Sequence, residues 1–242
     1  MLEQDELLAT AHAYGVSEGQ VRRDHLISHA LAALARTYLD DPDHGARLSE
    51  DIDLCAINRR EVATVIDERL PNLLRREFPR TTWDPPLRDV RAVEPGLLRT
   101  EDGTRVRVQL LDGKAHHDFT KWPTVVRVVG TRYRDIAAPI SLRVPTLASA
   151  AAMKTVAWMD RHAARDLYDL NGLAALGALN AETAELVREV TGWQVAPYMF
   201  RSLPSLDWHD QLGHQTKDLP TPESCLDRVR RAYGDALGWA LS

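Results

Sequence analysis

The sequence predicts an α+β protein, with a mixed sheet and flanking helices in the first part of the chain and a helical C-terminal half. Several short segments before Pro145 alternate apolar and polar residues, which is typical of half-buried strands. After Pro145 the apolar residues recur at helical spacing instead. This change at Pro145 predicts two domains, an α/β domain over residues 1–145 and a helical domain over residues 146–242.

The first elements are two helices and a strand. Residues 2–13 read as a short helix that Gly15 can stop. Ser17 and Gln20 have the spacing of a capping box, which predicts a second helix up to about residue 35. Residues 51–57, with the sequence DIDLCAI, alternate apolar and polar side chains and predict a strand.

The middle of the chain combines one further helix with several strands. Asn58 and Glu61 have capping-box spacing, and the helix they open is expected to break or kink at Pro71. Glu101-Asp102-Gly103 is a hairpin signal between two candidate strands. The strand candidates are residues 87–93, 96–100, 104–111, 125–129 and 141–144.

The last third is predicted to be helical, with an irregular stretch from Trp193 to Pro222. Thr146 can cap the first of its helices. The expected helices are residues 147–160, 165–176, 181–191 and 222–241.

Composition narrows the class of protein. The 242 residues carry a net charge of −5, and 44% of them are hydrophobic, which is ordinary for a folded globular chain. The most apolar stretch, residues 136–153, is interrupted by Arg143 and two prolines, so no membrane span is expected. Acidic residues near the N-terminus argue against a signal peptide, and two isolated cysteines fit a reducing compartment. We therefore expect a cytoplasmic protein.

Charge is unevenly distributed along the chain. Residues 59–134 hold 16 basic and 11 acidic residues, a net charge of +5, whereas residues 1–58 hold 4 basic and 11 acidic residues. A basic middle segment in an acidic protein indicates a polyanionic partner bound by one face, or a solvated arginine-rich surface.

Asp51 and Asp53 form the first candidate site. On a strand, residues i and i+2 point to the same side, so the two carboxylates would lie together. Their repulsion is relieved when a cation lies between them, and Mg²⁺ prefers carboxylates together with substrate phosphates. An exposed acidic strand end is the alternative interpretation.

Lys154, Asp166 and Asp169 form the second candidate site. Lys154 lies among apolar residues of a predicted helix, so its charge is expected to have a partner or a ligand. Asp166 and Asp169 share one face of the next helix. A buried Lys–Asp pair that joins the two helices is the alternative.

The two sites occur within a longer pattern. R-L-S-E-D-I-D-L from Arg47, a β-rich stretch, A-A-M-K ending at Lys154 and R-D-L-Y-D-L from Arg165 follow in that order. This pattern resembles the AbiEii/AbiGii toxin family, which includes the MenT-like toxins of mycobacteria. The resemblance extends from about residue 35 to the C-terminus, and it implies a nucleotidyltransferase fold for residues 1–145.

The resemblance implies a toxin, paired with a cognate antitoxin protein, that moves a nucleoside monophosphate from an NTP to the 3′ end of tRNA or another RNA acceptor. It implies Mg²⁺ or Mn²⁺ as the metal. The implied roles are metal binding and catalysis for Asp51 and Asp53, catalysis for Lys154 and Asp166, and nucleotide binding for Arg47, Ser49, Lys154 and Arg165.

The sequence departs from the family pattern at two places. Family members carry a Gly-Gly-Thr or Gly-Ser turn upstream of the paired aspartates, whereas residues 31–39 contain no glycine, as if a strand and its turn were deleted. Gln109 stands where many nucleotidyltransferases have a third carboxylate. Two alternatives therefore stay open: a degenerate, non-catalytic member that binds an antitoxin or RNA, and a nucleotidyltransferase that acts on a small molecule.

Overall fold

The computed structural model describes residues 2–35, 51–115, 118–129, 133–136, 140–203, 208–214, 216 and 219–239. The chain forms two compact units, and each is described by itself. Unit 1 comprises residues 1–120 and 125–144, and unit 2 comprises residues 121–124 and 145–242. Within the described residues, no helix is both long enough and apolar enough to cross a membrane.

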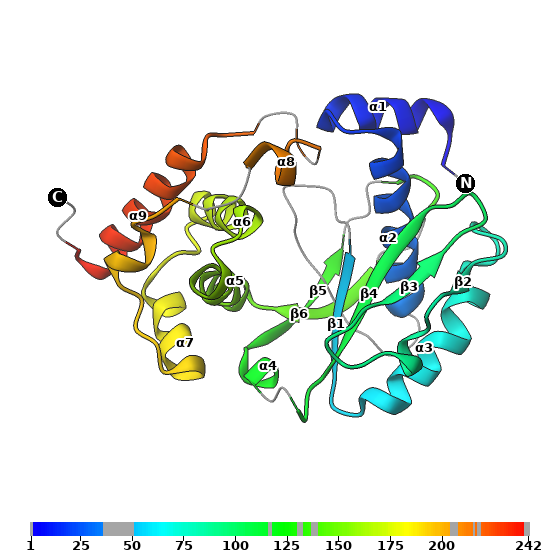
Figure 1. The fold of residues 1–242 in the computed structure, drawn as a ribbon, viewed down its shortest axis with the longest axis horizontal. Helices are drawn as coiled ribbons and strands as arrows, with labels where there is room; N and C mark the ends of the chain where they lie inside the picture. Colours follow the sequence, from blue (N-terminus) through cyan, green and yellow to red (C-terminus); the bar gives the residue numbers. More distant parts are fainter. Residues whose placement is uncertain are drawn as a thin grey trace. The chain divides into compact units, whose positions relative to one another are not determined.

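A four-stranded mixed sheet forms the centre of unit 1 (Figure 1). Its order is β1 (Asp51–Ala56), β4 (Arg105–Asp112), β3 (Gly96–Arg99) and β2 (Thr82–Trp83). The β1 strand pairs with β4 in parallel, and the other two pairings are antiparallel. The predicted strands at residues 51–57, 96–100 and 104–111 are confirmed, whereas the short β2 was not predicted. The expected α+β class with a mixed sheet is likewise confirmed.

One face of this sheet is apolar and covered by helices. Ile52, Val108 and Leu110 are at most 4% exposed, and they pack with apolar residues of α2 (Glu18–Ala35) and α3 (Arg59–Leu74). The opposite face carries the polar residues of the same strands. Because side chains alternate across a strand, burial of one face fixes which residues the other face presents.

The helices of unit 1 begin near the predicted residues, but the capping box expected at Asn58 is not formed, because the Asn58 side chain makes no cap hydrogen bond with the backbone of α3. The Ser17 hydroxyl accepts a hydrogen bond from the Gln20 backbone amide at 3.3 Å, at the start of α2. α1 (Gln4–Tyr14) precedes it and ends at Gly15, which is left-handed with φ of 65°. The break or kink expected at Pro71 does not end α3, which continues to Leu74.

The strand predicted at residues 87–93 is wrong. Leu87–Asp89 form a 3-10 helix, η1, instead. The backbone amides of Leu87 and Arg88 donate to the Asp67 carboxylate at 2.9 and 3.0 Å, and the Arg59 guanidinium donates to the carbonyls of Leu87 and Val90. Side chains of α3 thus satisfy the backbone groups that a strand would have given to a sheet.

A second, two-stranded sheet of β5 (Thr124–Val129) and β6 (Ile140–Pro145) lies in unit 1 except for its end residues Thr124 and Pro145. Both strands were predicted. The short α4 (Asp118–Lys121), which precedes β5, was not.

Unit 2 is helical, with α5 (Leu147–Arg161), α6 (Ala164–Ala175), α7 (Ala181–Thr191), η2 (Pro197–Phe200), α8 (Trp208–Leu212) and α9 (Pro222–Leu237). The Thr146 hydroxyl accepts from the Ser149 amide at 3.1 Å, so the predicted cap of α5 is confirmed. The stretch predicted as irregular contains η2 and α8.

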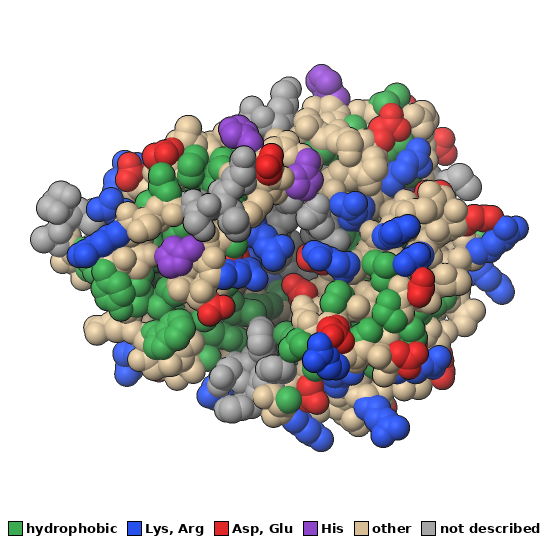
Figure 2. All heavy atoms as spheres, in the orientation of Figure 1, with side chains coloured by type: hydrophobic (Ala, Val, Ile, Leu, Met, Phe, Trp, Pro, Cys, Tyr) green, Lys and Arg blue, Asp and Glu red, His purple; other side chains and the backbone are tan. Residues whose placement is uncertain are grey.

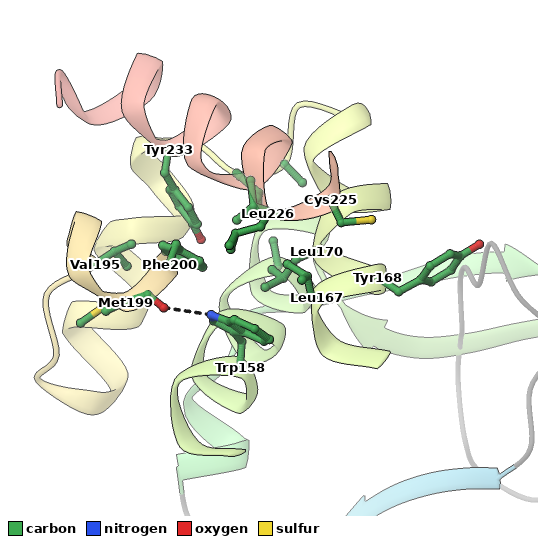
Figure 3. Packing of buried hydrophobic residues seen from close by; sticks show 14 of the residues in the cluster. Trp158, Leu167, Tyr168, Leu170, Val195, Met199, Phe200, Cys225, Leu226 and Tyr233 are labelled. Atoms are coloured by element: carbon green, nitrogen blue, oxygen red, sulfur yellow. Dashed lines mark hydrogen bonds between the residues drawn. The ribbon is translucent and has the colours of Figure 1, made fainter. Parts of the chain in front are cut away.

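The core of unit 2 is built from α5, α6, α9 and η2 (Figure 3). Trp158 is fully buried, and its indole donates to the Met199 carbonyl at 3.0 Å. The Tyr233 ring stacks on Phe200 with centroids 5.5 Å apart, and its hydroxyl lies 2.7 Å from that of Thr155. Every polar group named here that enters this core has a hydrogen-bond partner, as burial requires.

Candidate functional site

Asp51 and Asp53 lie on the polar face of β1. Ile52 between them is 4% exposed and points to the helix-covered face, so its burial directs both aspartates to the other side. Asp51 is half-buried and Asp53 is exposed. The sequence prediction that the two carboxylates share one face of a strand therefore agrees with the register of the sheet.

The neighbouring strand places an arginine and a glutamine beside these aspartates. In the parallel register Asp51 pairs with Arg107, and Asp53 pairs with Gln109. An Arg107 guanidinium nitrogen donates to Asp51 Oδ2 at 3.2 Å. This ion pair, which sequence reasoning did not anticipate, lowers the repulsion between the two carboxylates.

The chemistry of this face suits a hard divalent cation. Two carboxylates on one side of a strand provide the oxygen ligands that Mg²⁺ and Mn²⁺ prefer, and Asp53 is accessible from solvent. Gln109 can orient water or a ligand but adds no negative charge. The residues present thus fit a divalent metal that is held by two carboxylates and completed by substrate oxygens.

A charged cluster in unit 2 gathers residues of α5 and α6. Lys154 Nζ lies 2.7 Å from Asp169 Oδ2 and 3.5 Å from Asp166 Oδ1. One third of the Lys154 side chain is exposed, whereas Asp166 is 0% exposed. The structure therefore brings these three predicted residues together, with the ammonium at the solvent side of the buried carboxylate.

Arg161, which sequence reasoning missed, completes this cluster. Its guanidinium binds the Asp166 carboxylate through two hydrogen bonds, Nε to Oδ2 at 2.7 Å and Nη2 to Oδ1 at 2.8 Å. The left-handed His162, with φ of 47°, ends α5 so that its last turn meets the first turn of α6. The available signal was a basic residue just before a helix break, with an aspartate in the next first turn.

The remaining predicted site residues have no described contacts in this site. Arg165 is half-buried on α6, next to Asp166. Arg47 and Ser49 belong to residues 36–50, which lie outside the described part of the chain.

A mixed sheet with two aspartates on one strand, followed by a helical unit, is the arrangement expected of a nucleotidyltransferase-fold protein. The chain is similar to the solved structure of MenT4, a nucleotidyltransferase toxin from Mycobacterium tuberculosis, with a TM-score of 0.70 and 17% identity over 100% of this chain and 91% of that one. An antigenic nucleotidyltransferase-like protein from Paracoccidioides brasiliensis aligns with a TM-score of 0.34 and 15% identity over 79% of this chain and 89% of that one.

The family follows from the sequence. The sequence model of one protein family matches residues 43–235, and this family is that of the AbiEii nucleotidyltransferase toxins of type IV toxin–antitoxin systems. The chain belongs to this family, and it is therefore a nucleotidyltransferase toxin. No curated protein matches the chain. The family implies an NTP substrate and an antitoxin partner.

Proposed function

We propose that this toxin transfers a nucleoside monophosphate from an NTP to the 3′ end of tRNA, with residues 1–145 as the nucleotidyltransferase-like domain and residues 146–242 as the helical domain. The observation that carries the proposal is the pair of carboxylates, Asp51 and Asp53, on the polar face of β1 in a chain of the AbiEii family. The metal is Mg²⁺ or Mn²⁺, the acceptor is RNA, and the compartment is the cytoplasm.

Asp51 and Asp53 are the residues that would hold the metal. A divalent cation held there would supply positive charge to offset that of the triphosphate and of the leaving pyrophosphate. Arg107, which pairs with Asp51, would hold that one carboxylate in place before a metal binds. Phosphoryl transfer depends mainly on such positioning and charge neutralisation.

Lys154, Arg165, Arg47 and Ser49 are proposed to contact the nucleotide. Asp166 is proposed to have a different role from these residues, because its carboxylate is fully buried and is bound by Arg161. We assign Asp166 as a residue that positions Lys154, with Asp169 as the second partner of the same ammonium.

The positive charge on the polar face of the sheet supports an RNA acceptor. Arg105 and Arg107 on β4 and Arg99 on β3 alternate with the buried residues and therefore lie on the polar face. Figure 2 shows Lys and Arg side chains gathered over these strands. Basic side chains beside a metal site are what a phosphate backbone requires.

Label transfer from each NTP in turn to total tRNA, with Mg²⁺ or Mn²⁺, tests the proposal. We expect labelled tRNA with at least one NTP and loss of the label after 3′ exonuclease treatment. Absence of label with all four NTPs and both metals would contradict it. Label that resists the exonuclease would contradict the assignment of the 3′ end.

The absent glycine turn favours a second candidate, a non-catalytic protein that binds an antitoxin or RNA. Calorimetric titration with NTP and Mg²⁺ separates the two candidates. The transferase binds nucleotide and tRNA, whereas the degenerate protein binds no nucleotide.

The salt dependence of tRNA binding tests the acceptor. An RNA-binding face gives a steep fall of affinity with salt, because counterions are released from the phosphates. A flat dependence would favour a small-molecule acceptor instead.

A further inference from the structure

A cluster of metal-ligating side chains lies in unit 1 away from the paired aspartates. His25 and His29 are separated by four residues on α2 and so share one face of the helix. Asp135 approaches the same face from a segment that lies 110 positions further along the chain than His25. The ligand atoms of the three side chains all lie within 4.8 Å of one another.

The three closest atoms form a nearly equilateral triangle. His25 Nε2 lies 3.0 Å from Asp135 Oδ2, the two Nε2 atoms are 3.1 Å apart, and His29 Nε2 lies 3.2 Å from the same Oδ2. Ligand bonds of about 2.0–2.1 Å to a tetrahedral zinc ion put neighbouring ligand atoms about 3.3 Å apart. The observed triangle is thus close to one face of a tetrahedral coordination shell.

The surroundings hold the two imidazoles in this geometry. His25 and His29 are only 4% and 9% exposed. The Phe78 ring lies against both, with centroids 5.3 and 5.4 Å away, and the Tyr133 ring lies 4.8 Å from that of His25. An aromatic shell of this kind limits solvent access and restricts the ring orientations, as it does around metal centres.

The cluster also has a route to solvent. His25 lines a cavity of about 440 Å³ together with Arg22, Phe78 and Asp102. An ion can enter from this cavity, and a water molecule there can complete a fourth position. Imidazole nitrogens select zinc over magnesium, because Mg²⁺ prefers oxygen ligands.

We propose that His25, His29 and Asp135 form a zinc site that fastens the segment 133–136 to α2. The site is independent of the proposed transfer reaction, whose metal ligands are carboxylates on β1. Tyr133 lies two residues before Asp135, and its hydroxyl donates to Asp24 Oδ2 at 2.8 Å. This hydrogen bond is a second contact between the segment 133–136 and α2.

Zinc binding by the full chain, free of any histidine tag, tests the proposal with zinc alone as the probe. After dialysis against zinc and removal of the excess, we expect about one bound ion per chain in the wild type by elemental analysis. His29→Gln should weaken zinc binding at least about 100-fold in competition with a chromophoric chelator, since loss of an outer partner of a ligand already costs 10–100-fold. His12→Gln on the exposed side of α1 is the matched control and should bind as the wild type does.

Two further measurements keep the test decisive if a variant folds poorly. Asp135→Asn keeps the shape of the side chain and should also weaken zinc binding, and circular dichroism reports whether either variant is folded. Cobalt added to the unaltered protein should give the visible spectrum of a tetrahedral ion. Absence of zinc binding in the wild type, equal binding by His29→Gln and Asp135→Asn, or an octahedral cobalt spectrum would overturn the site and leave a triad held by hydrogen bonds alone.

Discussion

Asp166 and Glu185 are each bound by an arginine, and their surroundings decide what each ion pair contributes. Asp166 is 0% exposed and Arg161 is 45% exposed, whereas Glu185 and Arg188 are both about half exposed. A buried carboxylate that loses its cation keeps the cost of its own desolvation, but an exposed one is solvated again by water. The two pairs should therefore respond very differently to the same substitution.

Arg161→Met should lower the free energy of unfolding by about 2 kcal/mol, less than the 3–5 kcal/mol of a fully buried pair because Arg161 is partly exposed and Lys154 remains near the carboxylate. Urea denaturation measures this change. Arg188→Met is the matched control, with a change close to the error of the measurement. Equal effects of both variants would show that Arg161 does not compensate the Asp166 charge.

The two cysteines should differ in reactivity. Cys225 is fully buried, and burial raises the pKa of its thiol to about 11. Partial burial and the Asp112 charge also raise the pKa of Cys55, but that thiol is exposed on the face that carries Asp53. Iodoacetamide at pH 8 should therefore modify Cys55 first, as peptide mass analysis would report.

Alkylation of Cys55 should also inhibit nucleotide transfer, because the adduct would lie beside the paired aspartates. Cys55→Ala protein should keep its activity after the same treatment. Modified wild-type protein that retains full activity would contradict the assignment of this face to the reaction.

At the scale of single residues, the sequence predicts those features that depend only on the spacing of residues along the chain. The common face of Asp51 and Asp53 follows from the two-residue period of a strand. A Lys–Asp pair between the two helices was one of the two interpretations that the sequence around Lys154 allowed, and the Lys154–Asp169 contact is such a pair. Arg107 beside Asp51 depends on the register between strands 56 positions apart. The H-x-x-x-H spacing of His25 and His29 was present in the sequence, but Asp135 reaches it only through the tertiary fold.

At the scale of elements, local signals predict the helices better than the short strands. The α7 boundaries agree with the prediction at both ends, because Asn180 caps the helix and the left-handed Gly192 ends it. The strand expected at residues 87–93 failed, since its backbone groups bind side chains of α3. The two-residue β2 carries no periodicity from which it could be predicted.

Asp67→Ala tests this connection between α3 and η1. The buried carboxylate accepts the amides of Leu87 and Arg88, so its loss should lower the free energy of unfolding by about 2–3 kcal/mol. Asp89→Ala, an exposed carboxylate in the same 3-10 helix, is the control and should change it much less. Equal stability of Asp67→Ala and wild type in urea would contradict the role of Asp67.

At the scale of the whole molecule, the two units have separate cores. Leu110 belongs to the core of unit 1, and Phe200 belongs to that of unit 2. Each residue is fully buried, so truncation to alanine should cost about 2–5 kcal/mol within its own core.

Scanning calorimetry of Leu110→Ala and Phe200→Ala tests whether the units are domains in the thermodynamic sense. We expect two unfolding transitions, with each variant lowering the midpoint of a different one. A single transition that both variants shift equally would show one cooperative unit.

The central claim is that the carboxylates on β1 carry nucleotide transfer, and transfer of label to tRNA by three proteins tests it most directly. Asp53→Asn keeps the size of the side chain but removes a metal-binding charge, so we expect its rate to fall by about 100-fold or more, equivalent to about 2.7 kcal/mol of barrier. Glu68→Gln, an exposed carboxylate on α3, makes the same charge change in the same unit and should transfer label as the wild type does. Transfer by Asp53→Asn at the wild-type rate would contradict the account.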